Sequence, residues 1–285
     1  MTYMDITEIV IRNEPMLRLG CFLGVFIAIA VWEILLPRRP LTVSRWIRWS
    51  NNLAVAAFNA VLARVLLPAA VVGYADVVNL RDWGLLNQVI WPSWIEIIIA
   101  ILVLDFAIYL QHIFFHVVPA LWRVHRMHHA DLNFDVTTGS RFHPIEIMLS
   151  LGIKFGLVTI LGPAVIAVFI FEVLLSTSSI FNHGNIKIAR SVDYVLRWFF
   201  VTPDMHRVHH SIAVDEINSN YGFNLTWWDR LLGTYRAHPA AGHEGMIIGV
   251  ERFRTLRDLR LDRMLMQPWR RLAECSKIDQ EKINR

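Results

Sequence analysis

The stretch WIEIIIAILVLDFAIYLQHIFFH, residues 94–116, is an almost unbroken apolar run that ends in two histidines. It is long enough for one transmembrane helix, which needs about 20 apolar residues. Within it, Asp105, Tyr109, His112 and His116 recur at helical spacing and share one face. A carboxylate inside a membrane helix is costly and usually faces a functional interior. The run therefore predicts a membrane helix whose polar stripe leads to paired histidines.

Three further apolar segments, at roughly 17–36, 52–75 and 147–182, accompany this run. The first two have the length of one span. The third is about twice that length and is interrupted by Gly162-Pro163, which favours two short helices joined as a hairpin. The chain is 55% hydrophobic and only 18% charged, whereas soluble domains carry about 25% charge. We therefore predict an all-α membrane bundle of three single spans plus a helical hairpin.

Charge in the loops predicts the orientation. The loop PRRPLTVSRWIRW (37–49) contains four arginines, whereas YADVVNLRDWGLLNQVIW (74–91) contains one arginine and two aspartates. Positive-inside bias assigns the first loop to the cytoplasm, and counting spans puts every later histidine cluster on the same side, in a cytosolic helical cap. The expected location is a bacterial inner membrane. Because the basic residues flank apolar spans, nucleic-acid binding is not expected.

Histidine is the unusual residue type, with twelve in the chain, whereas the only cysteines are Cys21 and Cys275. Two cysteines at different depths cannot form a disulfide framework or a thiolate metal site. Nine of the histidines fall in four motifs, HIFFH (112–116), HRMHH (125–129), FNHGN (181–185) and DMHRVHH (204–210). Nine imidazoles exceed the capacity of one metal ion and suit two, and imidazole favours iron, zinc or copper.

These motifs resemble the fatty acid hydroxylase and sterol desaturase superfamily of membrane di-iron enzymes, in its bacterial-type branch with alkylglycerol monooxygenase-like members. The similarity covers about residues 95–245 and includes RFHPIE (141–146) and NSNYGFNLTWWDRLLGTY (218–235). The resemblance implies two iron ions, replaceable by zinc, with O₂ as co-substrate. The metal ligands that it implies are His112, His116, His125, His128, His129, His183, His206, His209 and His210.

Other polar residues are candidates for orienting these ligands, although Asn220 and Asp229 suit simple packing of the cytosolic cap equally. The candidates are Asp105, Tyr109, His143, Glu172, Asn220 and Asp229. His143 begins the sequence HPIE and is interpreted as a ligand-orienting or helix-start residue rather than a ligand. Glu172 stands on a stripe with Ser176, Ser179 and His183. Simple interhelical hydrogen bonding is the alternative for both stripes. His238 and His243 lie outside every motif and are expected to be exposed.

The predicted function is O₂-dependent hydroxylation or oxidation of a lipid, such as a fatty acyl, alkyl or sterol-like chain, that enters from the bilayer. A desaturase with the same centre is the alternative within enzymes, and a bis-histidine haem carrier or a metal transporter is a remote one. The sequence contains no HPGG or CxxC motif, so a separate electron donor of reductase, ferredoxin or cytochrome type is expected. We interpret 1–285 as one domain with a catalytic core at about 95–245. The basic tail, 246–285, has an arginine-rich part at 251–271 that suits an interfacial or a solvated surface helix equally.

Overall fold

A computed structural model describes residues 6–67 and 70–270 of the chain. These residues form helices, turns and isolated bridges but no strand, which confirms the all-α prediction. Five of the helical stretches are long and apolar enough to cross a membrane. The chain is therefore an integral membrane protein. Cys275 and the last part of the basic tail lie outside the described residues.

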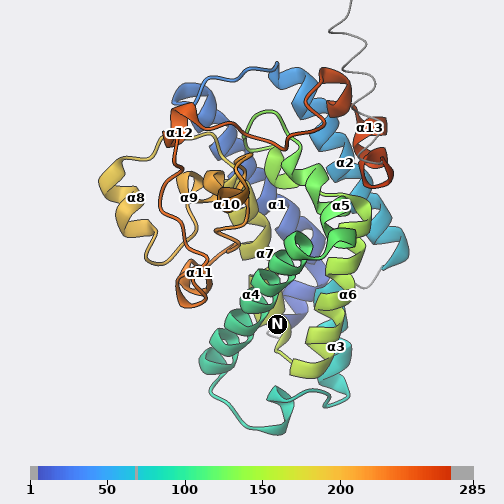
Figure 1. Ribbon diagram of the computed structural model, residues 1–285. Coiled ribbons are helices and arrows are strands. Elements are labelled where there is room, and N and C mark those ends of the chain that lie inside the picture. The colour runs from blue at the N-terminus through green and yellow to red at the C-terminus, as the bar shows by residue number, and fades with distance from the viewer. Residues whose placement is uncertain (1–5, 68–69, 271–285) are drawn as a thin grey trace, which may run out of the picture.

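The long helices form a bundle (Figure 1). Its elements are α1 (Ile6–Leu35), α2 (Arg45–Leu66), α3 (Ala70–Leu80), α4 (Ser93–Val117), α6 (Pro144–Leu161) and α7 (Val165–Asn182). Helix α7 lies inside the bundle, because it packs against α1, α3 and α4. Valines from α1, α3, α6 and α7 make one continuous apolar core. Outward-facing leucines and isoleucines of α1 remain exposed, as expected for a lipid-facing surface.

The predicted hairpin break is present. Helix α6 ends at Leu161, and Gly162 follows with a left-handed φ of 64° while its N–H bonds the carbonyl of Val158. A side chain at Gly84, in the loop between α3 and α4, would overlap the backbone of Gly162. Glycine is therefore required at both positions of this contact, which closes the end of the bundle opposite the histidines.

The second apolar segment differs from the prediction of one helix. Helix α2 ends at Leu66, and Leu67 has an extended φ of −134°. Helix α3 then begins at Ala70. Pro68 stands between them in the sequence, and the residue before a proline disfavours helical geometry. This proline explains why α2 and α3 are separate helices, although the apolar run is long enough for one membrane-spanning helix.

Shorter helices gather at one end of the bundle (Figure 1). They are α5 (Pro119–His129), α8 (Arg190–Leu196), α9 (Pro203–His209), α10 (Val214–Ile217), α11 (Trp227–Leu231) and α12 (Gly242–Gly245), with the single turn η2 (Thr138–Ser140). Residues 251–270 do not form the single surface helix that the sequence suggested. They fold as η3 (Leu256–Leu259), α13 (Leu261–Met266) and η4 (Gln267–Trp269). These turns pack on α2 and α5, where Arg123 Nε donates to the carbonyl of Pro268 at 2.7 Å.

Candidate metal centre

The nine motif histidines meet in two groups at the junction of the bundle and the short helices. Their positions follow from local structure, because each HxxHH triple belongs to one short helix that begins with a proline. The first triple lies on α5, which begins at Pro119, and the second lies on α9, which begins at Pro203 and has His210 as its C-cap. Proline suits the first helical position because it lacks the N–H that would be unpaired there. The first group is His112, His116, His125, His129 and His209, and the second is His128, His183, His206 and His210.

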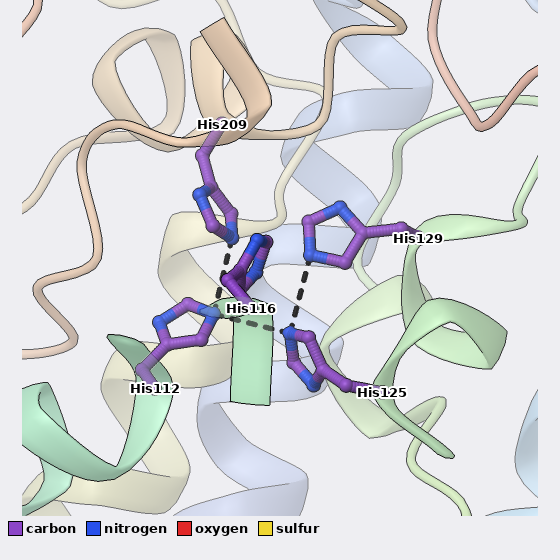
Figure 2. Close-up of side chains that lie close together, drawn as sticks. All are labelled: His112, His116, His125, His129 and His209. Carbon is purple, nitrogen blue, oxygen red and sulfur yellow. Dashed lines mark hydrogen bonds between the residues drawn. The ribbon is translucent and has the colours of Figure 1, made fainter. Parts of the chain in front are cut away.

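The first group converges from three helices (Figure 2). The Nε2 atom of His112 lies 3.1 Å from that of His125 and 3.0 Å from that of His209. The Nε2 atoms of His125 and His129 are 3.2 Å apart. His116 adds a buried Nε2 that has no hydrogen-bond partner. Five ring nitrogens therefore surround one small volume.

Hydrogen bonds on the far side of two rings fix their tautomers. His112 Nδ1 lies 2.7 Å from the carbonyl of Tyr221, and His209 Nδ1 lies 2.7 Å from the carbonyl of Ser219. A carbonyl only accepts, so each Nδ1 must carry the proton, and each Nε2 presents a lone pair. Two lone pairs that face each other at 3.0 Å repel unless a cation lies between them.

The second group has the same character. His183 Nδ1 donates to the carbonyl of Ser179 at 2.7 Å, which leaves a lone pair on Nε2. That single Nε2 faces the Nε2 atoms of His128, His206 and His210 at 3.2, 3.1 and 3.1 Å. One lone pair cannot accept three strong hydrogen bonds, so hydrogen bonding alone does not account for the arrangement.

Both groups have the geometry and chemistry of nitrogen metal sites. With metal–nitrogen bonds of about 2.0–2.1 Å, neighbouring ligand nitrogens are about 2.9 Å apart at 90° and about 3.4 Å apart at the tetrahedral angle. The observed spacings of 3.0–3.2 Å fall within this range. Burial, together with neighbouring histidines, lowers the pKa well below its usual value for His128, His129, His206, His209 and His210. Neutral imidazoles are the form that binds a metal.

Glu146 is a site residue that the sequence analysis missed. Its carboxylate accepts from His125 Nδ1 at 2.7 Å, and both side chains are buried. It stands on the first turn of α6, as the last residue of the sequence HPIE (143–146). His143 is the N-cap of that helix, where its Nδ1 accepts from the backbone N–H of Ile145 at 3.2 Å. The HPIE sequence therefore starts a helix whose first turn places the Glu146 carboxylate against His125. The acidic residue of this motif was the sequence feature that could have predicted this contact.

Asp229 holds the backbone that orients His112. Its carboxylate accepts from the N–H groups of Tyr221 and Gly222 at 2.8 and 2.9 Å, and the Tyr221 carbonyl accepts from His112. Burial raises the pKa of Asp229 to about 6, so it is ionised at neutral pH. Tyr109 reaches the same network through the hydroxyl of Thr234, which bonds Asp229 at 2.7 Å.

Two other candidates, Asp105 and Asn220, anchor loops through their side chains. Asp105 accepts from Trp228 Nε1 and Asn224 Nδ2, each at 2.8 Å, and so ties the segment before α11 to α4. Asn220, with a left-handed φ of 52°, donates to the carbonyl of Met205 at 2.9 Å. Both position the segment that contains Tyr221, and the backbone of Asn220 also hydrogen-bonds the ring of His206.

Of the two roles suggested for His143, the structure has the helix-start role, because His143 is the N-cap of α6 and its Nε2 faces the carbonyl of Leu265 at 3.1 Å rather than a ligand candidate. Two other expectations were wrong. Glu172 does not reach a histidine either, because it forms ion pairs with Lys154 and Arg18 at 2.5 and 3.1 Å. His238 is exposed as expected, whereas only 9% of the His243 side chain is exposed, 3.6 Å from Asp204.

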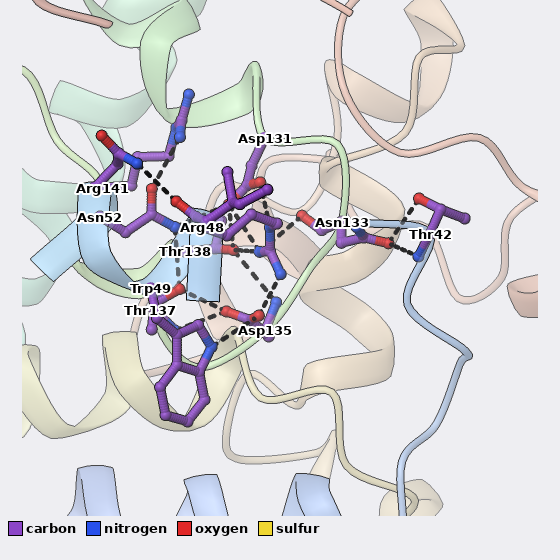
Figure 3. A network of polar contacts seen from close by, with 12 residues as sticks. Thr42, Arg48, Trp49, Asn52, Asp131, Asn133, Asp135, Thr137, Thr138 and Arg141 are labelled. Carbon is purple, nitrogen blue, oxygen red and sulfur yellow. Dashed lines mark hydrogen bonds and ion pairs between the residues drawn. The ribbon is translucent and has the colours of Figure 1, made fainter. Parts of the chain in front are cut away.

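A buried ion network fixes the loop between α5 and α6 (Figure 3). The Arg48 guanidinium makes a bidentate pair with Asp131 at 2.7 and 2.8 Å and also pairs with Asp135. Burial alone would raise the pKa of Asp131, but Arg48 lowers it well below the usual range. Asn52 of α2 adds bonds to Asp131 and Thr137. The loop that follows the first HxxHH triple is thereby attached to α2.

Comparisons with known proteins agree with these motifs. Residues 97–234 match the model of the fatty acid hydroxylase family, which confirms the predicted resemblance. The chain is 31% identical over 150 residues to ornithine lipid hydroxylase OlsE of Rhizobium tropici, covering 52% of this chain and 44% of that protein. It is 29% identical over 143 residues to human alkylglycerol monooxygenase, covering 48% and 30%. It is 27% identical over 147 residues to mouse cholesterol 25-hydroxylase, covering 50% and 48%. The matched part thus spans less than half of each of these relatives. No solved structure matches the chain.

Proposed function

We propose that this chain, whose residues 97–234 match the fatty acid hydroxylase family, is a membrane-bound non-haem di-iron oxidoreductase that uses O₂ to hydroxylate a lipid. The observation that carries the proposal is the pair of buried histidine groups, in which Nε2 atoms face one another at 3.0–3.2 Å. In the closest pair, His112 and His209, carbonyls hold the proton on both Nδ1 atoms, so two lone pairs face each other. The relatives named above are lipid hydroxylases and a monooxygenase by their names. Both facts support oxidation of a lipid C–H bond.

Each histidine group would hold one metal ion. Two iron ions bound there would supply the O₂-dependent chemistry that attacks an unactivated C–H bond. The chain's own residues would keep the imidazoles neutral and correctly oriented. Glu146 does so for His125, the Tyr221 carbonyl for His112, and the Ser179 carbonyl for His183. Such outer partners typically contribute about 10–100-fold in metal affinity or activity.

Apolar side chains beside both histidine groups support a lipid substrate. The Phe223 ring lies 5.3 Å from the His112 ring, in the first group, and 6.1 Å from the His206 ring, in the second. The same side chain packs against the apolar cluster of Leu104, Ile108 and Phe171 inside the bundle. An acyl, alkyl or sterol-like chain arriving from the bilayer would meet Phe223 beside the space between the two groups.

The electrons for this reaction would come from a separate donor protein of reductase, ferredoxin or cytochrome type. We further propose that the protein lies in a bacterial inner membrane with the histidine groups facing the cytoplasm. The support for this orientation is the arginine-rich loop at 37–49, which joins the site end of the bundle.

A comparison of lipids tests the activity. Cells that produce the protein should contain a lipid with one added oxygen atom that is absent from cells producing His128→Ala or His209→Ala. A lipid that has instead lost two hydrogen atoms would establish the alternative function, a desaturase. Identical lipids in all three strains would contradict both.

Metal analysis of the purified chain tests the centre independently. Protein made in iron-rich medium should hold about two equivalents of iron, or of zinc in its place, as two nitrogen sites require. A reproducible single equivalent in protein with all nine histidines would contradict the di-iron proposal. A Soret band in the optical spectrum would indicate the remote alternative, a haem carrier.

A further inference from the structure

A cluster of large apolar side chains is exposed outside the long helices. We define the α8–α11 surface by Tyr194, Val195, Trp198, Phe199, Phe200 and Leu231. The first five lie on α8 or directly after it, and Leu231 ends α11. Trp227 Nε1 donates to the carbonyl of Trp198 at 2.9 Å, and Arg230 donates to that of Arg197 at 2.9 Å. The two segments therefore form one continuous surface.

This surface is attached to α4 near the middle of its length. Asp105 accepts from Trp228 Nε1 at 2.8 Å, and the rings of Phe106 and Trp228 are 4.8 Å apart. Asp105 follows Ser93, the first residue of α4, by about 18 Å of helix rise. The apolar part of a bilayer is about 30 Å thick. With α4 spanning the bilayer, helix α11, which lies beside α4 in Figure 1, would be at the depth of the acyl chains.

We propose that the α8–α11 surface is inserted into the bilayer, beside α4, as a lipid-contacting shelf of the histidine-bearing cap. Its composition suits that place, because tryptophan and tyrosine concentrate where apolar and polar regions of a membrane meet. Lys187 and Arg190, both exposed, stand where α8 begins and would face anionic headgroups. A soluble protein partner would have to bind inside the hydrocarbon region beside α4, which disfavours that occupant.

Depth-dependent quenching tests the shelf without any measurement of activity. Single cysteines at Val195 and Leu231 would be introduced into a full-length Cys21→Ala, Cys275→Ala parent and labelled with a fluorophore. The matched controls are Leu256→Cys and Val214→Cys. Leu231 and Val214 are 74% and 73% exposed, and Val195 and Leu256 are 58% and 55% exposed. Each labelled protein would be placed in nanodiscs of phosphatidylglycerol and phosphatidylcholine whose acyl chains bear nitroxide groups.

The two shelf positions should be quenched several-fold more strongly than the two controls. Equal quenching at all four positions would overturn the proposal. A second copy of the chain could cover this surface instead. In that case the shelf fluorophores would not be quenched by the nitroxide lipids, but their fluorescence would change when the protein is diluted. This result would also overturn the proposal. Elution profiles and bound metal like those of the parent would establish that the variants fold. Because no readout depends on turnover, a failure here is separate from a failure of the proposed function.

Discussion

A single carboxylate decides which nitrogen of His125 faces the first histidine group. Glu146 accepts from Nδ1 at 2.7 Å, so the lone pair of His125 is on Nε2, between His112 and His129. We expect Glu146→Ala to weaken metal binding at the first group by about 10–100-fold, as loss of such a partner typically does. Metal titration of the purified variant would measure this. The second group should be unaffected, so that about one equivalent remains.

His143→Ala is the matched control on the same turn. His143 caps α6 and contacts the carbonyl of Leu265, so its loss should cost about 1 kcal/mol of stability, as for other N-caps, while both metal equivalents remain. The unfolding temperature and the metal content would be measured together. If His143→Ala lost metal while Glu146→Ala kept it, the roles assigned to these two residues would be reversed.

Gly139 packs closely against the backbone that orients His183 in the second group. A Cβ there would lie 2.5 Å from the Ser179 carbonyl oxygen and 3.3 Å from His183 Nδ1. We expect Gly139→Ala to displace the carbonyl that fixes the His183 tautomer, and so to reduce metal bound at the second group. Gly152→Ala in α6 is the control, because a Cβ there meets nothing within 4 Å. It should bind metal normally and gain up to about 1 kcal/mol of helix stability. Equal metal contents in the two variants would refute the steric argument.

At the level of elements, α2 and the loop after α5 are joined by buried ion pairs of Arg48. Arg48 pairs with both Asp131 and Asp135, and all three side chains are almost fully buried. Arg48→Met leaves two carboxylates without their cation, and breaking a buried pair in this way costs about 3–5 kcal/mol. We therefore expect a large fall in the unfolding temperature of the detergent-solubilised protein. The control is Trp46→Ala, two residues before Arg48 on α2. Because Trp46 is 83% exposed, this change should leave the unfolding temperature unchanged. Similar stabilities for the two variants would count against the network.

The elements that could be predicted are those that rest on local spacing. The Gly162-Pro163 break and the HxxHH triples depend on geometry within a few residues, and the structure has both. Partners distant in sequence could not be predicted. Glu172 shared helical spacing with His183, yet its carboxylate faces Lys154 on α6 and Arg18 on α1. Periodicity identifies the face of a helix but not which neighbouring helix covers it.

For the whole molecule, the two ends of the bundle differ in charge and in role. The histidine groups and the arginine-rich loop 37–49 are at one end, because Arg48 bonds the loop that follows α5. The loop between α3 and α4 is at the other, where the N–H of Leu85 bonds the carbonyl of Ile160 at the far end of α6. Positive-inside bias therefore predicts a cytoplasmic site end and an external Leu85.

Labelling with a membrane-impermeant maleimide tests this orientation. In the Cys21→Ala, Cys275→Ala parent, Leu85→Cys should react in intact spheroplasts, whereas Leu256→Cys should react only after the membrane is permeabilised. Both positions are well exposed, at 66% and 55%, so a difference in labelling reports the side of the membrane rather than burial. The physical reason is the cost of moving the arginines of 37–49 across the bilayer during insertion. The reverse pattern would put the histidine groups outside the cell, where a cytoplasmic electron donor could not reach them.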